Sequence, residues 1–121
     1  MKTSEFEIKL KIKLDENRIP ENISWESSEK NDLPRDVSSM LLSVWDKKEK
    51  NTHTIPLWTK DMIIDDFKLH VLQTIMTMGE TYNKATKDTE LYNYIKDLGY
   101  AFGEKAGIVK PVNEKDNKGI S

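Results

Sequence analysis

Apolar and charged side chains alternate strictly over residues 5–14, and no other part of the chain is patterned so regularly. The even positions are apolar: Phe6, Ile8, Leu10, Ile12 and Leu14. The odd positions carry two glutamates followed by three lysines, Lys9, Lys11 and Lys13. A period of two predicts a half-buried β-strand whose even face meets the core. We interpret the lysine face as a solvated sheet face, with contact to an anionic partner as the alternative.

A turn rich in Asp, Asn and Pro over residues 15–22 leads into a second predicted strand at residues 23–27. In this short segment Ile23 and Trp25 alternate with polar residues, so both side chains are expected to face the core. A hairpin with the first strand is the simplest connection between the two.

The next segment has a helical pattern. Its apolar residues recur at three- and four-residue intervals, at Val37, Met40, Leu41, Val44 and Trp45. This spacing predicts one apolar face of a helix that Asp36 caps and that ends near Asp46, with Trp45 in the core. The charged residues 47–51 then form the turn that follows the helix.

Residues 52–59 alternate again and predict a third strand. Proline cannot donate a ladder hydrogen bond, so Pro56 places this strand at a sheet edge or at a bulge. By strand parity Trp58 points away from Ile55 and Leu57, toward the open face of the sheet. A bulge at Pro56 would reverse that parity and bury Trp58 in the core.

Two long helices are predicted next, one from Asp61 or Asp65 to about Thr86 and one from the cap Asp88 to about Gly107. The first carries two apolar stripes and therefore contacts two partners, either the sheet and the last helix or the sheet and another subunit. In the last helix glycines recur every four residues, at positions 99, 103 and 107, which indicates close packing of helix backbones.

These elements predict an α+β domain over residues 1–108 with the order ββαβαα, followed by a disordered tail at residues 109–121. The expected sheet is three-stranded and antiparallel, with strand order 2-1-3 and the long first strand in the centre. Three helices cover one of its faces, and the charged face of the first strand remains in solvent.

The composition of the chain excludes several classes of function. The chain has 121 residues, a formal net charge of −2 and no cysteine. The negative charge argues against general binding of nucleic acid, and the absence of cysteine excludes disulfides and zinc–sulfur sites. No run of apolar residues is long enough to span or insert into a membrane, and the N-terminus lacks the apolar core of a signal peptide. We therefore expect a soluble cytoplasmic protein.

Two segments resemble a known family. LDENRIPENISW at residues 14–25 and MLLSVWDKKEKNTHTIPLWTKDMIIDDF at residues 40–67 are similar to the gliding motility protein GldC of Bacteroidetes, and the similarity extends more loosely over residues 4–104. The resemblance implies a cytoplasmic accessory protein of the gliding machinery with no catalytic residues. It also suggests the lipoprotein GldB as a possible partner, through gene neighbourhood alone.

Candidate chemistry is sparse. Asp65, Asp66 and His70, with His53 as an optional further ligand, could bind a metal because Asp66 and His70 share a helix face. Helix capping by Asp65 and a favourable helix-dipole position for Asp66 explain the same residues structurally. No nucleotide-binding or nucleophile motif is present.

Our prediction is therefore a non-catalytic adaptor that needs no cofactor or metal and that acts through protein–protein contacts. The expected partner-binding residues are Trp58, Pro56, Lys9, Lys11 and Lys13. A small metal- or ligand-dependent enzyme that uses the Asp65, Asp66 and His70 neighbourhood is the alternative, and self-association remains open.

Overall fold

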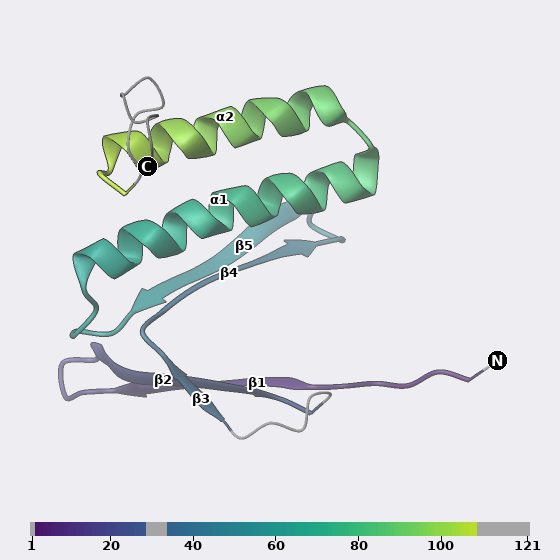
Figure 1. Cartoon of the computed structure of the whole chain (residues 1–121). Coiled ribbons are helices and arrows are strands. Elements are labelled where there is room, and N and C mark those ends of the chain that lie inside the picture. Colours follow the sequence, from purple (N-terminus) through teal and green to yellow (C-terminus); the bar gives the residue numbers. More distant parts are fainter. Residues whose placement is uncertain (1, 29–33, 109–121) are drawn as a thin grey trace. The chain divides into compact units, whose positions relative to one another are not determined.

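The computed structural model describes residues 2–28 and 34–108, and the chain divides into two compact units at Met62 and Ile63. The first unit contains five strands and the second contains two helices (Figure 1). The strands are β1 (Ile8–Leu14), β2 (Pro20–Ser27), β3 (Arg35–Val37), β4 (Ser39–Asp46) and β5 (Asn51–Trp58). The helices are α1 (Ile64–Thr86) and α2 (Thr89–Lys105). The α+β class is confirmed, whereas the predicted order ββαβαα is wrong.

Strands β1, β2 and β3 form an antiparallel sheet with β2 in the centre. Ile23 of β2 lies between Ile12 of β1 and Val37 of β3, and it is completely buried. The expected strand order 2-1-3 is therefore wrong, because the short β3, which the helical pattern concealed, occupies the second edge of β2. In the part of the chain that the structure describes, Ile23 is the one apolar side chain with full burial.

The even face of β1 is less buried than its pattern predicts. Leu10 is half-buried, but Phe6, Ile8, Ile12 and Leu14 are between 36% and 56% exposed. A strand at the edge of a three-stranded sheet has neighbours on one side only, which leaves much of its apolar face open.

The helix predicted over residues 36–46 is absent, and β3 and β4 take its place. Strand β4 pairs with β5 in a two-stranded antiparallel ribbon whose register runs from Ser39 opposite Trp58 to Asp46 opposite Asn51. The charged residues between them form the hairpin turn and do not terminate a helix. In this turn Asp46 Oδ1 accepts hydrogen bonds from the backbone N–H groups of Lys48 and Glu49, at 2.9 and 2.7 Å.

The register of the ribbon runs without a break through Pro56, which lies opposite Leu41. The alternative of a bulge that buries Trp58 is therefore wrong, and the Trp58 side chain is 56% exposed. The prediction that Trp45 belongs to the core is also wrong, because this side chain is 62% exposed. Trp25, on the central strand β2, is partly buried.

Helices α1 and α2 run side by side as a hairpin (Figure 1). Asp88 caps α2 as predicted, since its Oδ1 accepts a hydrogen bond of 3.0 Å from the Leu91 N–H. The predicted caps of α1 are wrong, because Ile63 occupies the N-cap position and makes no side-chain cap bond. Lys87 ends α1 in the left-handed conformation, and Gly107 follows α2 with a φ of 80°.

Buried glycines allow the two helices to approach closely, as the four-residue spacing predicts. Gly79, Gly99 and Gly103 are buried. A Cβ atom at position 79 would lie 2.9 Å from Cγ2 of Ile95, and one at position 99 would overlap the sulfur of Met76. Close packing of α2 against α1 is thus confirmed at Gly99. The prediction is wrong for Gly107, the last glycine of the expected series, which lies beyond the end of α2 and has no described atom within 4 Å of its Cβ position.

Within residues 2–28 and 34–108, neither helix is long and apolar enough to cross a bilayer. The tail predicted at residues 109–121 lies outside the described residues. The single domain over residues 1–108 stays a prediction.

We predict that Gly79→Ala destabilises the chain more than Gly99→Ala does. Alanine favours a helix by about 1 kcal/mol over glycine, but overpacking costs about 1–3 kcal/mol. Ile95, which faces position 79, is β-branched and stiff, whereas the long Met76 side chain at position 99 can move aside. Urea denaturation followed by circular dichroism measures both variants. Equal stability of the two, or a larger loss for Gly99→Ala, would contradict this packing.

Candidate interaction surfaces

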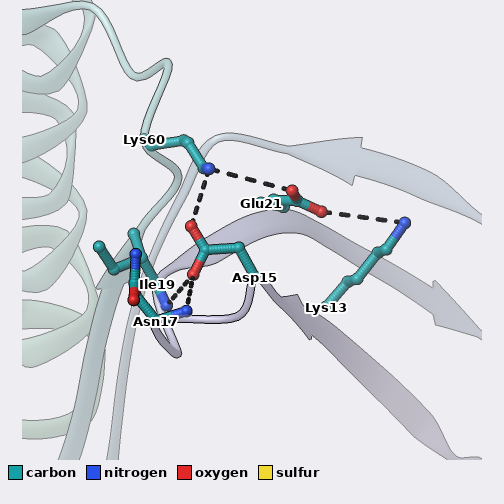
Figure 2. A network of polar contacts seen from close by, with 6 residues as sticks. All are labelled: Lys13, Asp15, Asn17, Ile19, Glu21 and Lys60. Carbon is teal, nitrogen blue, oxygen red and sulfur yellow. Dashed lines mark hydrogen bonds and ion pairs between the residues drawn. The ribbon is translucent and has the colours of Figure 1, made fainter.

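Lys60, which follows β5, forms an ion pair with Asp15 in the turn between β1 and β2 (Figure 2). The distance from Lys60 Nζ to Asp15 Oδ2 is 2.8 Å, and the Asp15 side chain is only 12% exposed. The other oxygen, Oδ1, accepts hydrogen bonds from the backbone N–H groups of Asn17 at 2.8 Å and Ile19 at 3.0 Å. Both oxygens of this carboxylate therefore have partners.

These contacts shift the pKa values of both groups. The hydrogen bond from Lys60, followed by the one from the Ile19 N–H, lowers the pKa of Asp15 below its usual 3.8. The same hydrogen bond raises the pKa of Lys60 above its usual 10.5. Glu21 extends the network, because its carboxylate oxygens lie 3.9 Å from Lys60 Nζ and from Lys13 Nζ.

The residues beside Lys60 attach the end of β5 to other strands. The Thr59 N–H donates to the carbonyl of Ser38 at 2.9 Å, and the Lys60 N–H donates to the carbonyl of Pro20 at 3.1 Å. Thr59 is 3% exposed, and its hydroxyl donates to Asp61 Oδ1 at 2.6 Å. The segment 59–61 thus connects the ribbon to β2 and to the junction of β3 and β4.

Sequence periodicity gave no indication of this junction. Asp15 lies in a polar turn and Lys60 in a loop, and neither belongs to an alternating pattern. Both do lie in the two segments that carry the family resemblance, residues 14–25 and 40–67. The structure brings those two segments into contact through Asp15 and Lys60.

The predicted site residues Trp58 and Pro56 lie on one face of the ribbon. In an antiparallel pair, residues opposite each other point to the same side. Trp58 and Pro56 therefore share a face with Leu41 and, through the pair Trp45 and Thr52, with Trp45. We call this surface, made of Leu41, Trp45, Pro56 and Trp58, the tryptophan face. Sequence reasoning missed Trp45, because the helical interpretation placed it in the core.

The tryptophan face carries no charge from Ser39 to Trp45 on β4 or from Thr52 to Trp58 on β5. The remaining residues of this face are Ser39, Ser43, Thr52 and Thr54. An uncharged, partly aromatic surface loses little solvation when a partner covers it. Such a surface is suited to a protein partner.

The predicted residues Lys9, Lys11 and Lys13 lie on the three-stranded sheet and not on the ribbon. Lys9 faces Glu26 at 3.8 Å, and Lys13 faces Glu21 at 3.9 Å. Lys11 pairs across the strands with Ser24. Exposed ion pairs of this kind contribute little to stability, and they reduce the net positive charge of this face. The arrangement favours the solvated sheet face over an anion-binding surface.

The metal candidate Asp65, Asp66 and His70 does not form a cluster of ligand atoms. Asp65 is 90% exposed and lies 4.0 Å from Lys68 Nζ, while the His70 ring packs edge-on against Phe67. Among residues 2–28 and 34–108, the group of His, Asp and Glu side chains with ligand atoms within 4.8 Å is Asp46, Glu49 and His53.

This second group belongs to the hairpin turn between β4 and β5. His53 Nε2 lies 3.0 Å from Glu49 Oε1, and Asp46 Oδ1 accepts the two turn N–H groups. Glu49 and His53 are exposed, and three lysines stand beside them in the turn. We therefore assign these residues a structural role in closing the hairpin.

Comparison with protein-family models matches residues 20–108 to the family described as gliding motility-associated protein GldC-like. The match covers both helices and every strand except β1. Neither the curated proteins nor the solved structures contain a match to the chain.

We predict that Asp15→Asn lowers the free energy of unfolding of the first unit, which contains the five strands, by an amount that depends on pH. Because the pKa of Asp15 is lowered in the folded state, its contribution is present above pH 3.8 and is lost as the pH falls through the folded-state value. Lys60, whose pKa is raised, contributes below pH 10.5 and loses that contribution as the pH rises through its folded-state value. The stability difference between wild type and Asp15→Asn should thus be largest near neutral pH and vanish in strong acid.

Denaturant titrations at several pH values measure this difference, with Glu16→Gln as the matched control. This control removes the same charge from the next position of the turn. A difference for Asp15→Asn that does not change with pH, or that Glu16→Gln reproduces, would refute the role of the ion pair.

Proposed function

The chain belongs to the GldC-like family of gliding motility-associated proteins, and we propose that it is a non-catalytic accessory protein of the gliding machinery. It acts in the cytoplasm by binding other proteins of that machinery. The tryptophan face of the β4–β5 ribbon is the docking surface.

The observation that carries this proposal is the exposure of two tryptophans on one uncharged face. Trp45 is 62% exposed and Trp58 is 56% exposed. Tryptophan is among the residues that most often dominate binding energy, and a fully buried aromatic side chain removes about 150–250 Å² from water. Leu41 and Pro56 lie between them and extend the apolar surface.

A ribbon of two strands is also a suitable element for docking. Its apolar side chains lie on both faces, since Val44 and Ile55 on the opposite face are 53% and 47% exposed. A two-stranded hairpin is at best marginally stable without a layer packed against it. Binding of a partner would therefore both stabilise the ribbon and recognise its side chains.

In the first unit, the polar side chains outside the tryptophan face that make close contacts have a structural role. Asp15 and Lys60 neutralise each other, and Asp46 closes the hairpin turn. The matched family is described by its association with motility and not by a reaction. Both facts support a binding function over catalysis.

We predict that Trp58→Ala abolishes capture of a gliding-machinery protein without loss of the fold. The Trp58 side chain contributes to the docking surface and is not enclosed by the ribbon, so its truncation removes contact area from the complex. For a binding hot spot this loss costs about 2 kcal/mol or more of binding free energy. Tagged wild type and variant are purified from gliding cells, and the bound proteins, GldB among them, are identified by mass spectrometry.

Tyr94→Ala is the control, because Tyr94 is an aromatic residue that is 73% exposed and belongs to α2, not to the ribbon. The melting temperature of each variant is measured in parallel. Capture that survives both Trp58→Ala and Trp45→Ala would overturn the proposed docking surface. Loss of gliding in a folded Asp66→Ala, His70→Ala variant, together with divalent-metal binding that the wild type shows and the variant lacks, would instead favour the enzyme alternative.

A further inference from the structure

Strand β1 lies at an edge of its sheet, where β2 is its hydrogen-bonded neighbour among the strands that the structure describes. Directly before β1, the Glu7 carbonyl accepts the Ser28 N–H at 3.0 Å, and the Glu7 N–H donates to Ser28 Oγ at 2.9 Å. Alternate residues of a strand direct their backbone groups to opposite sides, so the odd residues of β1 bond to β2. The even residues, Ile8, Leu10 and Ile12, therefore direct their N–H and C=O groups to the open edge, where another strand can pair.

The alternating pattern begins before the ladder between β1 and β2 does. Residues 5–7 precede β1 and continue its direction away from the sheet (Figure 1). Within the sheet, Glu7 and Lys11 lie opposite the uncharged residues Ser28 and Ser24. Two glutamates followed by lysines at the same parity thus form a charge pattern that the pairing with β2 only partly uses.

We propose that β1 pairs with β1 of a second copy of the chain. The two strands run antiparallel about a two-fold axis at Ile8, so that two three-stranded sheets join into one continuous sheet. The proposal concerns the first unit alone and is independent of the docking surface on the ribbon.

The first argument is charge complementarity. A two-fold axis at Ile8 places Glu5 opposite Lys11 of the second copy and Glu7 opposite Lys9 of the second copy. Every charge from Glu5 to Lys11 then faces an opposite charge, and symmetry produces each pair twice. An axis one or two residues away in either direction would place like charges opposite each other, which destabilises a strand pair. Lysines alone would oppose pairing at an edge, so the two glutamates are what make a second copy the fitting partner.

The second argument is the direction of the backbone groups. An axis at Ile8 brings even residues opposite even residues, so the N–H and C=O groups that β1 directs to its open edge meet those of the second copy. The charged odd residues then occupy the pairs without hydrogen bonds, where the Cα atoms are about 4.5 Å apart and the side chains are closest. The register that pairs the charges is therefore one that the backbone hydrogen bonds also allow.

The third argument is the apolar face of β1. Phe6 and Ile8 are 54% and 56% exposed, although both belong to the face whose alternation predicts burial. In the proposed pair Phe6 lies opposite Leu10 of the second copy, and Ile8 lies opposite its own counterpart. Pairing thus covers apolar side chains that β2 leaves open, while the charged face of the joined sheet stays in solvent.

Sedimentation velocity of the full chain over a wide range of concentration tests the proposal. Wild type should form a dimer with twice the 14.1 kDa mass of one chain. Lys11→Glu places like charges opposite each other at two symmetric pairs and should raise the dissociation constant of the dimer at least about tenfold, as should Glu5→Lys. The two reversals combined in one chain restore opposite charges, and this double variant should have a dissociation constant close to that of wild type.

The matched control is Glu7→Lys combined with Lys11→Glu. It exchanges the same two kinds of charge and keeps the net charge, but in the proposed register it leaves like charges opposite each other at every pair. This control should dissociate at least as readily as Lys11→Glu alone, and circular dichroism verifies that each variant is folded. A wild type that stays monomeric at high micromolar concentration overturns the proposal. Dimerisation that Lys11→Glu does not weaken, or that the control restores, overturns it as well.

The absence of cysteine permits a second measurement that changes no charge. Ile8→Cys faces itself across the axis at a Cα separation of about 5.5 Å, which lies in the range of disulfides, so oxidation should link two copies. Ile12→Cys, on the same face of β1, lies opposite Ser4 of the second copy. The two copies of this cysteine are then eight positions apart, about 27 Å along the strands, and should not be linked. Equal linkage of both variants, or no linkage of Ile8→Cys, would contradict the proposed pairing.

Discussion

Among the residues that the structure describes, very few apolar side chains are enclosed by their neighbours. A side chain is enclosed only when neighbours surround it on several sides, and among the described residues Ile23, between two flanking strands, is the apolar side chain that reaches this state. The β4–β5 ribbon has two strands and the hairpin has two helices, and the large apolar side chains of each are partly or largely exposed. Exposed apolar surface of this extent is typical of proteins that bind other proteins.

Polar contacts supply the connections that apolar packing does not. Thr59 and Lys60 attach the end of β5 to Ser38 and Pro20 through backbone hydrogen bonds, and the Lys60 side chain reaches Asp15. The ion pair is effective because the turn at Asn17 and Ile19 already holds the carboxylate in place. The ribbon is therefore tied to the other strands at its base, while Trp45 and Trp58 on its tryptophan face are 62% and 56% exposed.

Local patterns predicted the elements that local interactions determine. The alternation in β1, β2 and β5 and the long periodic segments of α1 and α2 each indicated the correct element, and Asp88 was correctly identified as the cap of α2. The apolar spacing of the segment 37–45 fits a period of 3.6 and therefore predicts a helix. Its pairing with β5 outweighed that local preference.

The residues of the candidate surfaces also divide into those that local sequence patterns place and those that only non-local pairing places. The shared face of Trp58 and Pro56 can be predicted because parity along β5 can be read from the sequence, whereas the position of Trp45 depends on the non-local pairing of β4. Asp15 and Lys60 are distant in the chain, and only the fold places them 2.8 Å apart. The order of strands in the sheet depended on β3, a three-residue strand too short to have a recognisable period.

We propose that the ribbon is the surface through which the chain binds the gliding machinery. Hydrogen exchange of backbone amides, compared between the free chain and the complex isolated from gliding cells, tests it most directly. Our account predicts slower exchange in Ser39–Asp46 and Asn51–Trp58 on binding, with little change in Ile8–Leu14. Unchanged exchange in the ribbon, together with protection confined to other elements, would contradict it.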